Sequence, residues 1–558
     1  MKRLWCSLLL VLTACATAPA PAKLIYNGRI YLGHVHGAAP WPSVEALLVR
    51  DGRVAAAGSL AELESLAGSC ERIDLRGGVA LPGLQDAHGH FEGLGAALET
   101  VDLRNCRSYA ELVERVRARA AEVPSGTWIE GRGWDQNLWT PQEFPHHAEL
   151  SAAVPQHPVL LHRVDGHASL ANARAMEVAG VLKVRDSEAV GEGGRVLLDS
   201  ERKPTGVFID DACALVQASV PPPSRETRAR RFLRAQKELL SLGLTAVHDM
   251  GIDREGLEIL RDLHERGELR VRAIEYLSGD GELAAEDVSG LPWSSGPDGR
   301  LSVVGVKLYA DGALGSRGAA LLEPYHDDPS HAGLALLDAS SLQRSVSVCA
   351  LHELQPAVHA IGDRANRMVL DAYERQSELD PDFRSLRPRV EHAQVVAPAD
   401  WKRFESLGAI ASMQPTHATS DMPWAPQRLG PERIAGAYAW RRLVNDPARL
   451  AFGSDFPVES PDPRLGLYAA VTCARPDGTP AGGFLPEQRL TPTEAFAAFT
   501  LGAARAVREE GRRGLLLPGY AADLTVFAAD PFQQSPERWL TLPVRATIVN
   551  GETVFVAP

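Results

Sequence analysis

The stretch LPGLQDAHGHFEG, residues 81–93, decides how the rest of the chain is interpreted. An apolar run ends in a Pro-Gly turn and is followed by two histidines one residue apart, His88 and His90. Positions i and i+2 of an extended segment point to the same side, and neutral imidazole is the commonest protein metal ligand. The two side chains are therefore candidates to bind one cation together. A pair of surface histidines is the alternative, and a motif this short does not decide between them.

Apolar segments typical of strands alternate with helical stretches, such as 108–123 and 224–243, between residues 81 and 500. This alternation predicts βα units and a parallel sheet, and a closed (β/α)8 TIM barrel is the favoured α/β fold. The expected strands are 79–90, 245–250, 302–312, 354–363, 389–396, 409–416 and 449–458. Residues 124–240 are expected to form an insertion, with 127–139 and 158–170 as its ordered parts.

Most of these strands end in a residue that can bind a metal ion or move a proton. The carboxyl ends of the strands of such a barrel line its active site, so residues far apart in sequence converge there. Any one of these residues alone is better explained as structural, but six at equivalent positions favour a metal centre. They are His88, His90, Lys307, His359, His392 and Asp455.

Both ends of the body are rich in short strands and tight turns. Residues 23–80 and 501–558 contain Asn-Gly and Asp-Gly turns between apolar runs. Because the termini of a large domain often lie close together, we expect the two pieces to complete one small β-sandwich domain.

The N-terminus has the features of a bacterial secretory signal, residues 1–14. Lys2 and Arg3 precede an apolar stretch, and the sequence LTAC ending at Cys15 resembles a lipoprotein box. Cys15 is then lipidated, residues 15–22 form a tether, and the protein is expected in the cell envelope, at the periplasm or outer membrane. An ordinary cleaved signal peptide is the alternative. No later segment has 18 uninterrupted apolar residues, so we expect membrane attachment only through the lipid.

The composition is that of an acidic globular protein. The formal net charge is -13, and loss of the two positive charges of Lys2 and Arg3 gives -13 - 2 = -15. An acidic body without a basic cluster argues against a nucleic-acid partner. The chain has seven cysteines; those beyond residue 15 are widely spaced and indicate no disulfide framework. The oligomeric state stays open.

Six motifs together resemble the signatures of the amidohydrolase superfamily. They are LPGLQDAHGH, GVKLYADGALGSR, AVHAIGDRAN, RVEHAQ, SMQPTHATSD and AFGSDFPV. Within it, the chain is similar to the YtcJ-like and N-substituted formamide deformylase-like hydrolases of the amidohydrolase 3 branch. The resemblance covers residues 23–558, including the end strands, which match the family's small β-sandwich.

The resemblance implies a role for each ligand. His88 and His90 bind the more buried metal, Asp455 binds it too and acts as general base, and His359 and His392 hold the second metal. The cofactor is then one or two divalent ions, with zinc favoured, and the ion activates water as hydroxide near neutral pH.

Lys307 occupies the place where related enzymes carry a carboxylated lysine between the two ions. An ammonium has no lone pair for a cation, whereas a carbamate formed with carbon dioxide offers two oxygens. An unmodified Lys307 in a one-metal site is the alternative.

The resemblance implies a hydrolase acting on a C–N bond of a small molecule: an amide, formamide or cyclic amide. Other hydrolysis at the same site is the first alternative: that of an ester, carbamate or dipeptide, or deamination. A lipid-anchored binding protein without turnover is the second, although a pure binder needs no general base.

Five further residues are weaker candidates for substrate contact or for orienting a ligand. His417 follows the expected seventh strand, and Asp363 and Arg364 follow His359 closely. His167 and Trp134 lie in the expected insertion, where they are candidates to cover the pocket, although a buried Trp is more often a packing residue.

Overall fold

The structure is a computed structural model that describes residues 22–35, 39–164, 167–184, 194–279, 283–296, 298–443 and 450–558. The predicted signal segment and Cys15 lie outside these residues. No helix in the described ranges is long and apolar enough to cross a membrane. The chain forms two compact units: Met1–Gly89, Glu238–Asp253 and Leu269–Pro558 make the first, and His90–Lys237 and Arg254–Glu268 make the second.

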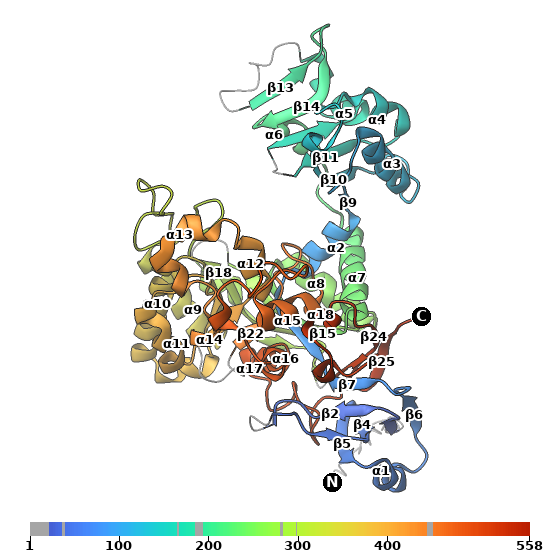
Figure 1. Cartoon of the computed structure of the whole chain (residues 1–558), viewed down its shortest axis with the longest axis vertical. Coiled ribbons are helices and arrows are strands. Elements are labelled where there is room, and N and C mark those ends of the chain that lie inside the picture. The colour runs from blue at the N-terminus through green and yellow to red at the C-terminus, as the bar shows by residue number, and fades with distance from the viewer. Residues whose placement is uncertain are drawn as a thin grey trace, which may run out of the picture. The chain divides into compact units, whose positions relative to one another are not determined.

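Eight parallel strands of the first unit follow one another around a nearly closed barrel. Figure 1 labels three of them, β15, β18 and β22, among the helices of this unit. In sheet order they are β8 (Leu84–Gly89), β15 (Leu244–Ile252), β16 (Arg272–Ser278), β18 (Leu301–Tyr309), β19 (Gln355–Ala360), β20 (Arg389–His392), β21 (Ile410–Met413) and β22 (Leu450–Phe452). The short β17 (Trp293–Ser294) pairs antiparallel with β18. The predicted (β/α)8 barrel is confirmed.

Helices connect the strands of the second half of the barrel. Helices α9 (Ala339–Leu351) and α10 (Asp363–Leu379) flank β19, with α10 beginning three residues after that strand ends. The helices that follow in the chain are α11 (Trp401–Leu407), α12 (Pro415–Asp421), α13 (Ala425–Arg433), α14 (Trp440–Leu443), α15 (Pro463–Thr472), α16 (Pro492–Ala498), α17 (Leu501–Ala506) and α18 (Pro536–Trp539).

The first and last strands of the barrel meet just beyond the end of β22. The Asp455 amide donates to the His88 carbonyl at 2.7 Å, and the Ser454 hydroxyl donates to the buried Asp86 carboxylate at 2.7 Å. A Cβ at Gly453 would lie 2.4 Å from the His88 nitrogen. Glycine therefore permits the close approach that brings His88 and Asp455 together.

Two mixed sheets from both chain ends form the predicted β-sandwich. The first has the order β5-β4-β1-β6 and the second β25-β24-β23-β7-β2-β3, in which β7 from the N-terminal part pairs antiparallel with β23 from the C-terminal part. Apolar side chains of both sheets pack in one buried cluster. The strands are β1 (Lys23–Tyr26), β2 (Arg29–Tyr31), β3 (Ser43–Val44), β4 (Ala46–Arg50), β5 (Arg53–Gly58), β6 (Glu71–Asp74), β7 (Val79–Pro82), β23 (Leu524–Phe527), β24 (Val544–Val549) and β25 (Glu552–Val556), with helix α1 (Leu60–Ala67).

The observed barrel strands differ from the expected ones in two places. The single strand expected at 79–90 is two strands, because Pro82 and Gly83 redirect the chain from β7 of the sandwich into β8 of the barrel. Strand β16, which lies between β15 and β18 in the barrel, is missing from the expected set.

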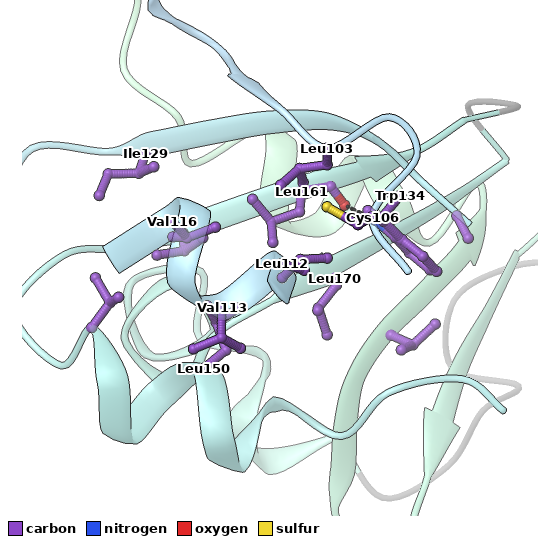
Figure 2. Close-up of a cluster of buried hydrophobic side chains, with 14 of the residues drawn as sticks. Leu103, Cys106, Leu112, Val113, Val116, Ile129, Trp134, Leu150, Leu161 and Leu170 are labelled. Atoms are coloured by element: carbon purple, nitrogen blue, oxygen red, sulfur yellow. Dashed lines mark hydrogen bonds between the residues drawn. The ribbon is translucent and has the colours of Figure 1, made fainter. Parts of the chain in front are cut away.

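A six-stranded sheet with helices on both faces makes up much of the second unit. Its order is β13-β14-β12-β11-β10-β9, so it begins at β9 rather than near residue 124 as expected. One face buries the cluster of Figure 2, in which α3 side chains pack on the sheet. The strands are β9 (Val101–Asp102), β10 (Ile129–Trp134), β11 (Val159–Arg163), β12 (Ala168–Ala171), β13 (Gly194–Leu198) and β14 (Pro204–Asp210). The helices that begin in this unit are α2 (Phe91–Glu99), α3 (Tyr109–Ala120), α4 (His147–Ala153), α5 (Ala173–Val178), α6 (Cys213–Gln217), α7 (Arg225–Ser241) and α8 (Arg254–Glu265).

Candidate metal centre

Separate barrel strands bring the predicted ligands to one place. His88 lies near the carboxyl end of β8, His359 near that of β19, and His392 is the last residue of β20. The ring centroid of His392 is 4.7 Å from that of His88 and 4.6 Å from that of His359. Three imidazoles that are far apart in sequence therefore pack against one another, as the barrel topology predicted.

Asp455, just beyond β22, faces two histidines with its two carboxylate oxygens. Oδ1 lies 3.4 Å from His88 Nε2, and Oδ2 lies 3.7 Å from His417 Nε2. The structure contains two groups of three residues whose ligand atoms all lie within 4.8 Å of one another inside the group. One group is His88, His90 and Asp455, and the other is His392, His417 and Asp455. Asp455 belongs to both groups, so it is placed to serve two ion positions.

A buried carboxylate fixes the orientation of His88. Glu391 Oε2 lies 2.6 Å from His88 Nδ1, and the Arg389 guanidinium donates to both Glu391 oxygens, at 2.7 and 3.1 Å. Burial by itself raises the pKa of Glu391, but Arg389 and His88 hold it well below its ordinary value. An ionised carboxylate only accepts hydrogen bonds, so Nδ1 of His88 donates and Nε2 keeps its lone pair for a metal.

His392 is oriented in the same way by an amide. Its Nδ1 lies 2.8 Å from Oε1 of Gln414, the residue that follows β21. The Nδ1–H of His392 donates to this oxygen, which leaves Nε2 as the metal-binding nitrogen. Burial lowers the pKa of His392 well below its ordinary value, so the ring is neutral.

Lys307 and His359 are buried at the same end of the barrel, where burial disfavours their charged forms. Lys307 Nζ lies 3.5 Å from His88 Nε2. Burial lowers the pKa of Lys307 to about 8 and that of His359 to about 3. The Nε2 of His359 is buried and has no hydrogen-bond partner in the described part of the chain. A neutral imidazole nitrogen without such a partner fits a metal ligand, because a metal binds the deprotonated nitrogen.

The backbone at two of these residues is in the left-handed region. His392 has φ 71° and Asp455 has φ 60°, conformations that L-residues adopt at a cost of about 1–2 kcal/mol. Such conformations concentrate at functional sites, where the surrounding structure holds them.

Asp363 and Arg364, two of the weaker candidates, bond to backbone groups of a loop. Asp363 Oδ1 accepts a hydrogen bond from the Leu322 amide at 2.8 Å, and Arg364 Nη2 donates to the Gly333 carbonyl at 3.4 Å. Both therefore anchor the long loop after β18, although Nε of Arg364 is buried and has no hydrogen-bond partner within the described ranges.

The two candidates in the second unit, His167 and Trp134, differ in exposure to solvent. His167 is exposed and lies 3.0 Å from Asp210 through Nδ1. Trp134 is fully buried, and its indole nitrogen donates to the Leu161 carbonyl at 2.9 Å (Figure 2). Trp134 is therefore a core residue of this unit, which agrees with the packing alternative rather than with the pocket-covering role.

Glu391, Arg389 and Gln414 are supporting residues that the sequence motifs did not single out. A signal for the first two was present: an arginine and a glutamate two residues apart in an apolar strand lie on the same side of it, and a buried pair of opposite charge needs partners. Nothing local distinguishes Gln414 from an ordinary polar residue.

A parallel barrel with a histidine and carboxylate cluster at the carboxyl ends of its strands defines the class of (β/α)8 proteins with a candidate metal centre. A family model described as "Amidohydrolase family" matches residues 71–555. The chain belongs to this family, as its motifs indicated, and is therefore a hydrolase by family.

The relatives agree with this assignment. The chain is 32% identical to the putative amidohydrolase YtcJ of Bacillus subtilis over 92% of its own length and 96% of that protein. It is 25% identical to the N-substituted formamide deformylase of Arthrobacter pascens, over 91% and 94% of the two chains. The crystal structure of an uncharacterized metal-dependent hydrolase from Pyrococcus horikoshii is similar with a TM-score of 0.75 and 30% identity, over 92% of this chain and 99% of that one.

Proposed function

We propose that this protein is a metal-dependent amidohydrolase that hydrolyses the C–N bond of a small amide, formamide or cyclic amide. The observation that carries the proposal is the position of Asp455, whose two oxygens face histidines from different parts of the barrel. A carboxylate in this position can bind a cation and still keep lone pairs with which to accept a proton. The name of the Arthrobacter relative, a formamide deformylase, supports the choice of a C–N bond.

The residues that would hold the ions are His88, His90, Lys307, His359, His392 and Asp455. A divalent ion bound there would lower the pKa of water to about 7 and polarise the substrate carbonyl. The chemistry of this donor set fits zinc, which takes imidazole nitrogens and carboxylate oxygens.

Asp455 is the group that we propose moves the proton. Its carboxylate accepts a proton from the attacking water and delivers it to the nitrogen of the leaving amine, because an amine must be protonated to leave an amide. His88 and His392 are held by Glu391 and Gln414 so that their Nε2 atoms stay in place during this exchange.

We also propose that the protein is a lipid-anchored protein of the bacterial cell envelope. The support is the sequence of residues 1–15 alone, with its basic start, apolar stretch and LTAC box. Metabolic labelling with a fatty acid, compared between the natural chain and Cys15→Ala, tests this assignment.

The hydrolase proposal is tested with a panel of N-formyl, N-acyl and cyclic amides and matched esters, assayed with the metal-reconstituted protein. We expect turnover of at least one amide class and its loss in Asp455→Asn, which keeps the shape of the side chain. Equal turnover by the Asp455→Asn variant would refute the proposed general base. Turnover of esters alone would overturn the choice of a C–N bond.

A further inference from the structure

His417 lies where the barrel's seventh strand delivers it to the candidate centre. It belongs to α12, which begins two residues after β21. Its Nε2 is 3.7 Å from Asp455 Oδ2, and its ring lies 5.9 Å from that of His392 at an angle of 22°. The sequence pattern predicts a substrate-facing or orienting role for this residue, and the geometry indicates a different one.

The contact between His417 and Asp455 is too long for a hydrogen bond. Ring N–H groups bond to oxygen at about 2.7–3.2 Å. Although the Nε2 atom is buried, it has no hydrogen-bond partner among the residues that the structure describes. A nitrogen in this position is either poorly satisfied or a ligand for something between it and the carboxylate.

The spacing matches that of two ligands on one ion. Bonds of about 2.0–2.1 Å in a tetrahedral site place neighbouring ligand atoms about 3.3–3.5 Å apart. The Asp455 Oδ2 and His417 Nε2 atoms are 3.7 Å apart. Ligand atoms of His392, His417 and Asp455 all lie within 4.8 Å of one another, which is the reach of a common ion after small shifts.

We infer that His417 is a ligand of a second metal ion, which it holds together with His392 and Asp455. The inference rests on the proposed metal-dependent function and adds to it a ligand from the seventh strand. Asp455 Oδ1 would serve the ion of His88 and His90, and Oδ2 would serve the ion of His392 and His417, to which His359 is the further ligand that the motifs imply. Each carboxylate oxygen keeps a second lone pair, and the proton taken from water would sit on one of these.

The segment that carries His417 also orients the partner ligand. Gln414, three residues earlier, accepts the hydrogen bond from His392 Nδ1. One short stretch after β21 therefore supplies a ligand and fixes the tautomer of another, so the second ion position depends on this stretch more than the first does.

The test is the number and affinity of bound metal ions in chelator-stripped protein titrated with Co²⁺ and followed by its visible absorption. We expect two ions in the natural protein. His417→Ala should bind the first ion normally and the second at least about 100-fold more weakly, because loss of even an outer partner of a ligand costs about 10–100-fold. Added imidazole should restore the second absorption change in this variant. His417→Gln, which keeps a polar side chain of similar length, should show the same loss if His417→Ala does not fold.

Matched variants separate a ligand from other roles. His331→Ala removes an exposed histidine of the same unit, whose Nε2 lies 3.0 Å from the Arg317 carbonyl oxygen, and it should bind both ions as the natural protein does. Unchanged affinity for both ions in the His417 variants, or a single ion in the natural protein, overturns the inference. Absence of amide hydrolysis with intact two-ion binding would instead refute the proposed reaction and leave the ligand assignment standing.

Discussion

The ionised state of one residue, Glu391, sets which nitrogen of His88 can bind a metal. Glu391 is fully buried and receives two hydrogen bonds from Arg389, which also donates to the Ala87 carbonyl at 2.6 Å and the Ser412 hydroxyl at 2.9 Å. The guanidinium thus ties this carboxylate of β20 to strands β8 and β21. His88 consequently has a rigid partner on one side of its ring and the candidate ion position on the other.

Glu391→Gln should weaken metal binding. A glutamine amide can donate as well as accept, so it no longer requires that His88 Nδ1 carry the proton. The other tautomer, with the proton on Nε2, then becomes populated and cannot bind the metal through Nε2. The affinity for the first ion should therefore fall about 10–100-fold. Competition with a chelating dye measures it on folded protein. Because this variant also leaves Arg389 without its charge partner, Gln414→Leu provides a milder counterpart at His392, and Glu374→Gln on the exposed face of α10 is the control. Natural affinity in folded Glu391→Gln would contradict the orienting role.

Lys307 should carry a carbamate in the metal-loaded protein. Its burial lowers its pKa to about 8, which increases the share of the neutral amine, the form that reacts with carbon dioxide. Protein prepared with ¹³C-bicarbonate and divalent metal should give a carbamate carbon resonance that Lys307→Met lacks. No resonance in the loaded natural protein would leave the unmodified lysine as the correct alternative.

At the scale of residues, the ligands were easier to predict from the sequence than their supports. His88, His359, His392 and Asp455 stand at strand ends, a position that the alternation of strands and helices makes recognisable from the sequence alone. Gln414 and Glu391 act through contacts between residues 22 and 303 positions apart in the chain, and these contacts follow from register rather than from local pattern.

At the scale of elements, a buried ion pair joins barrel strand β16 to the sandwich. Arg272 donates two hydrogen bonds to the Asp523 carboxylate, from Nε to Oδ2 at 2.7 Å and from Nη2 to Oδ1 at 2.9 Å. The backbone N–H of Asn550 donates to Oδ1 of the same carboxylate at 2.8 Å. Burial alone raises the pKa of Asp523, but the Arg272 guanidinium and these hydrogen bonds lower it below its ordinary value. The pair fixes the start of β16 against the residue that precedes β23.

Asp523→Asn should destabilise the first unit by about 3–5 kcal/mol, because it leaves Arg272 buried without its counter-charge. The pKa of Asp523 is lower in the folded protein than in the unfolded chain, where it is about 3.9. Its contribution to the free energy of unfolding is therefore fully present above about pH 3.9 and is lost as the pH falls through the pKa of the folded state. The difference in unfolding midpoint between the natural protein and the variant should therefore be constant near neutral pH and shrink below about pH 4. Glu71→Gln, in the exposed pair with Lys23, should change stability by less than about 1 kcal/mol. A difference that grows toward low pH would contradict the assigned charge state.

The barrel strands that could be predicted from the sequence are mostly those that end in a residue able to bind a metal ion or move a proton. Strand β16 ends at Ser278 without a group that binds metal, so a search guided by polar strand ends passes over it. The division between β7 and β8 was concealed because both strands are buried and only Gly83 lies between them. A Cβ at Gly83 would lie 2.4 Å from the Thr245 hydroxyl oxygen, so the redirecting turn depends on contact with β15, which the sequence does not reveal.

At the scale of the whole molecule, bound metal should stabilise the fold that assembles its ligands. A ligand at about 100 times its dissociation constant adds about 2.7 kcal/mol to the folded state, which is a rise of several degrees in the midpoint of thermal unfolding. Re-addition of zinc to stripped protein should produce this rise in the natural chain and little of it in His88→Ala. An equal rise in both proteins would place the stabilising ion elsewhere.

The most direct test of the central claim is anomalous diffraction from crystals of the zinc-loaded protein, collected on both sides of the zinc absorption edge. The account predicts an anomalous peak about 2.0–2.2 Å from both His88 Nε2 and Asp455 Oδ1. Zinc peaks found only away from these atoms, or none in protein that carries zinc in solution, would contradict it.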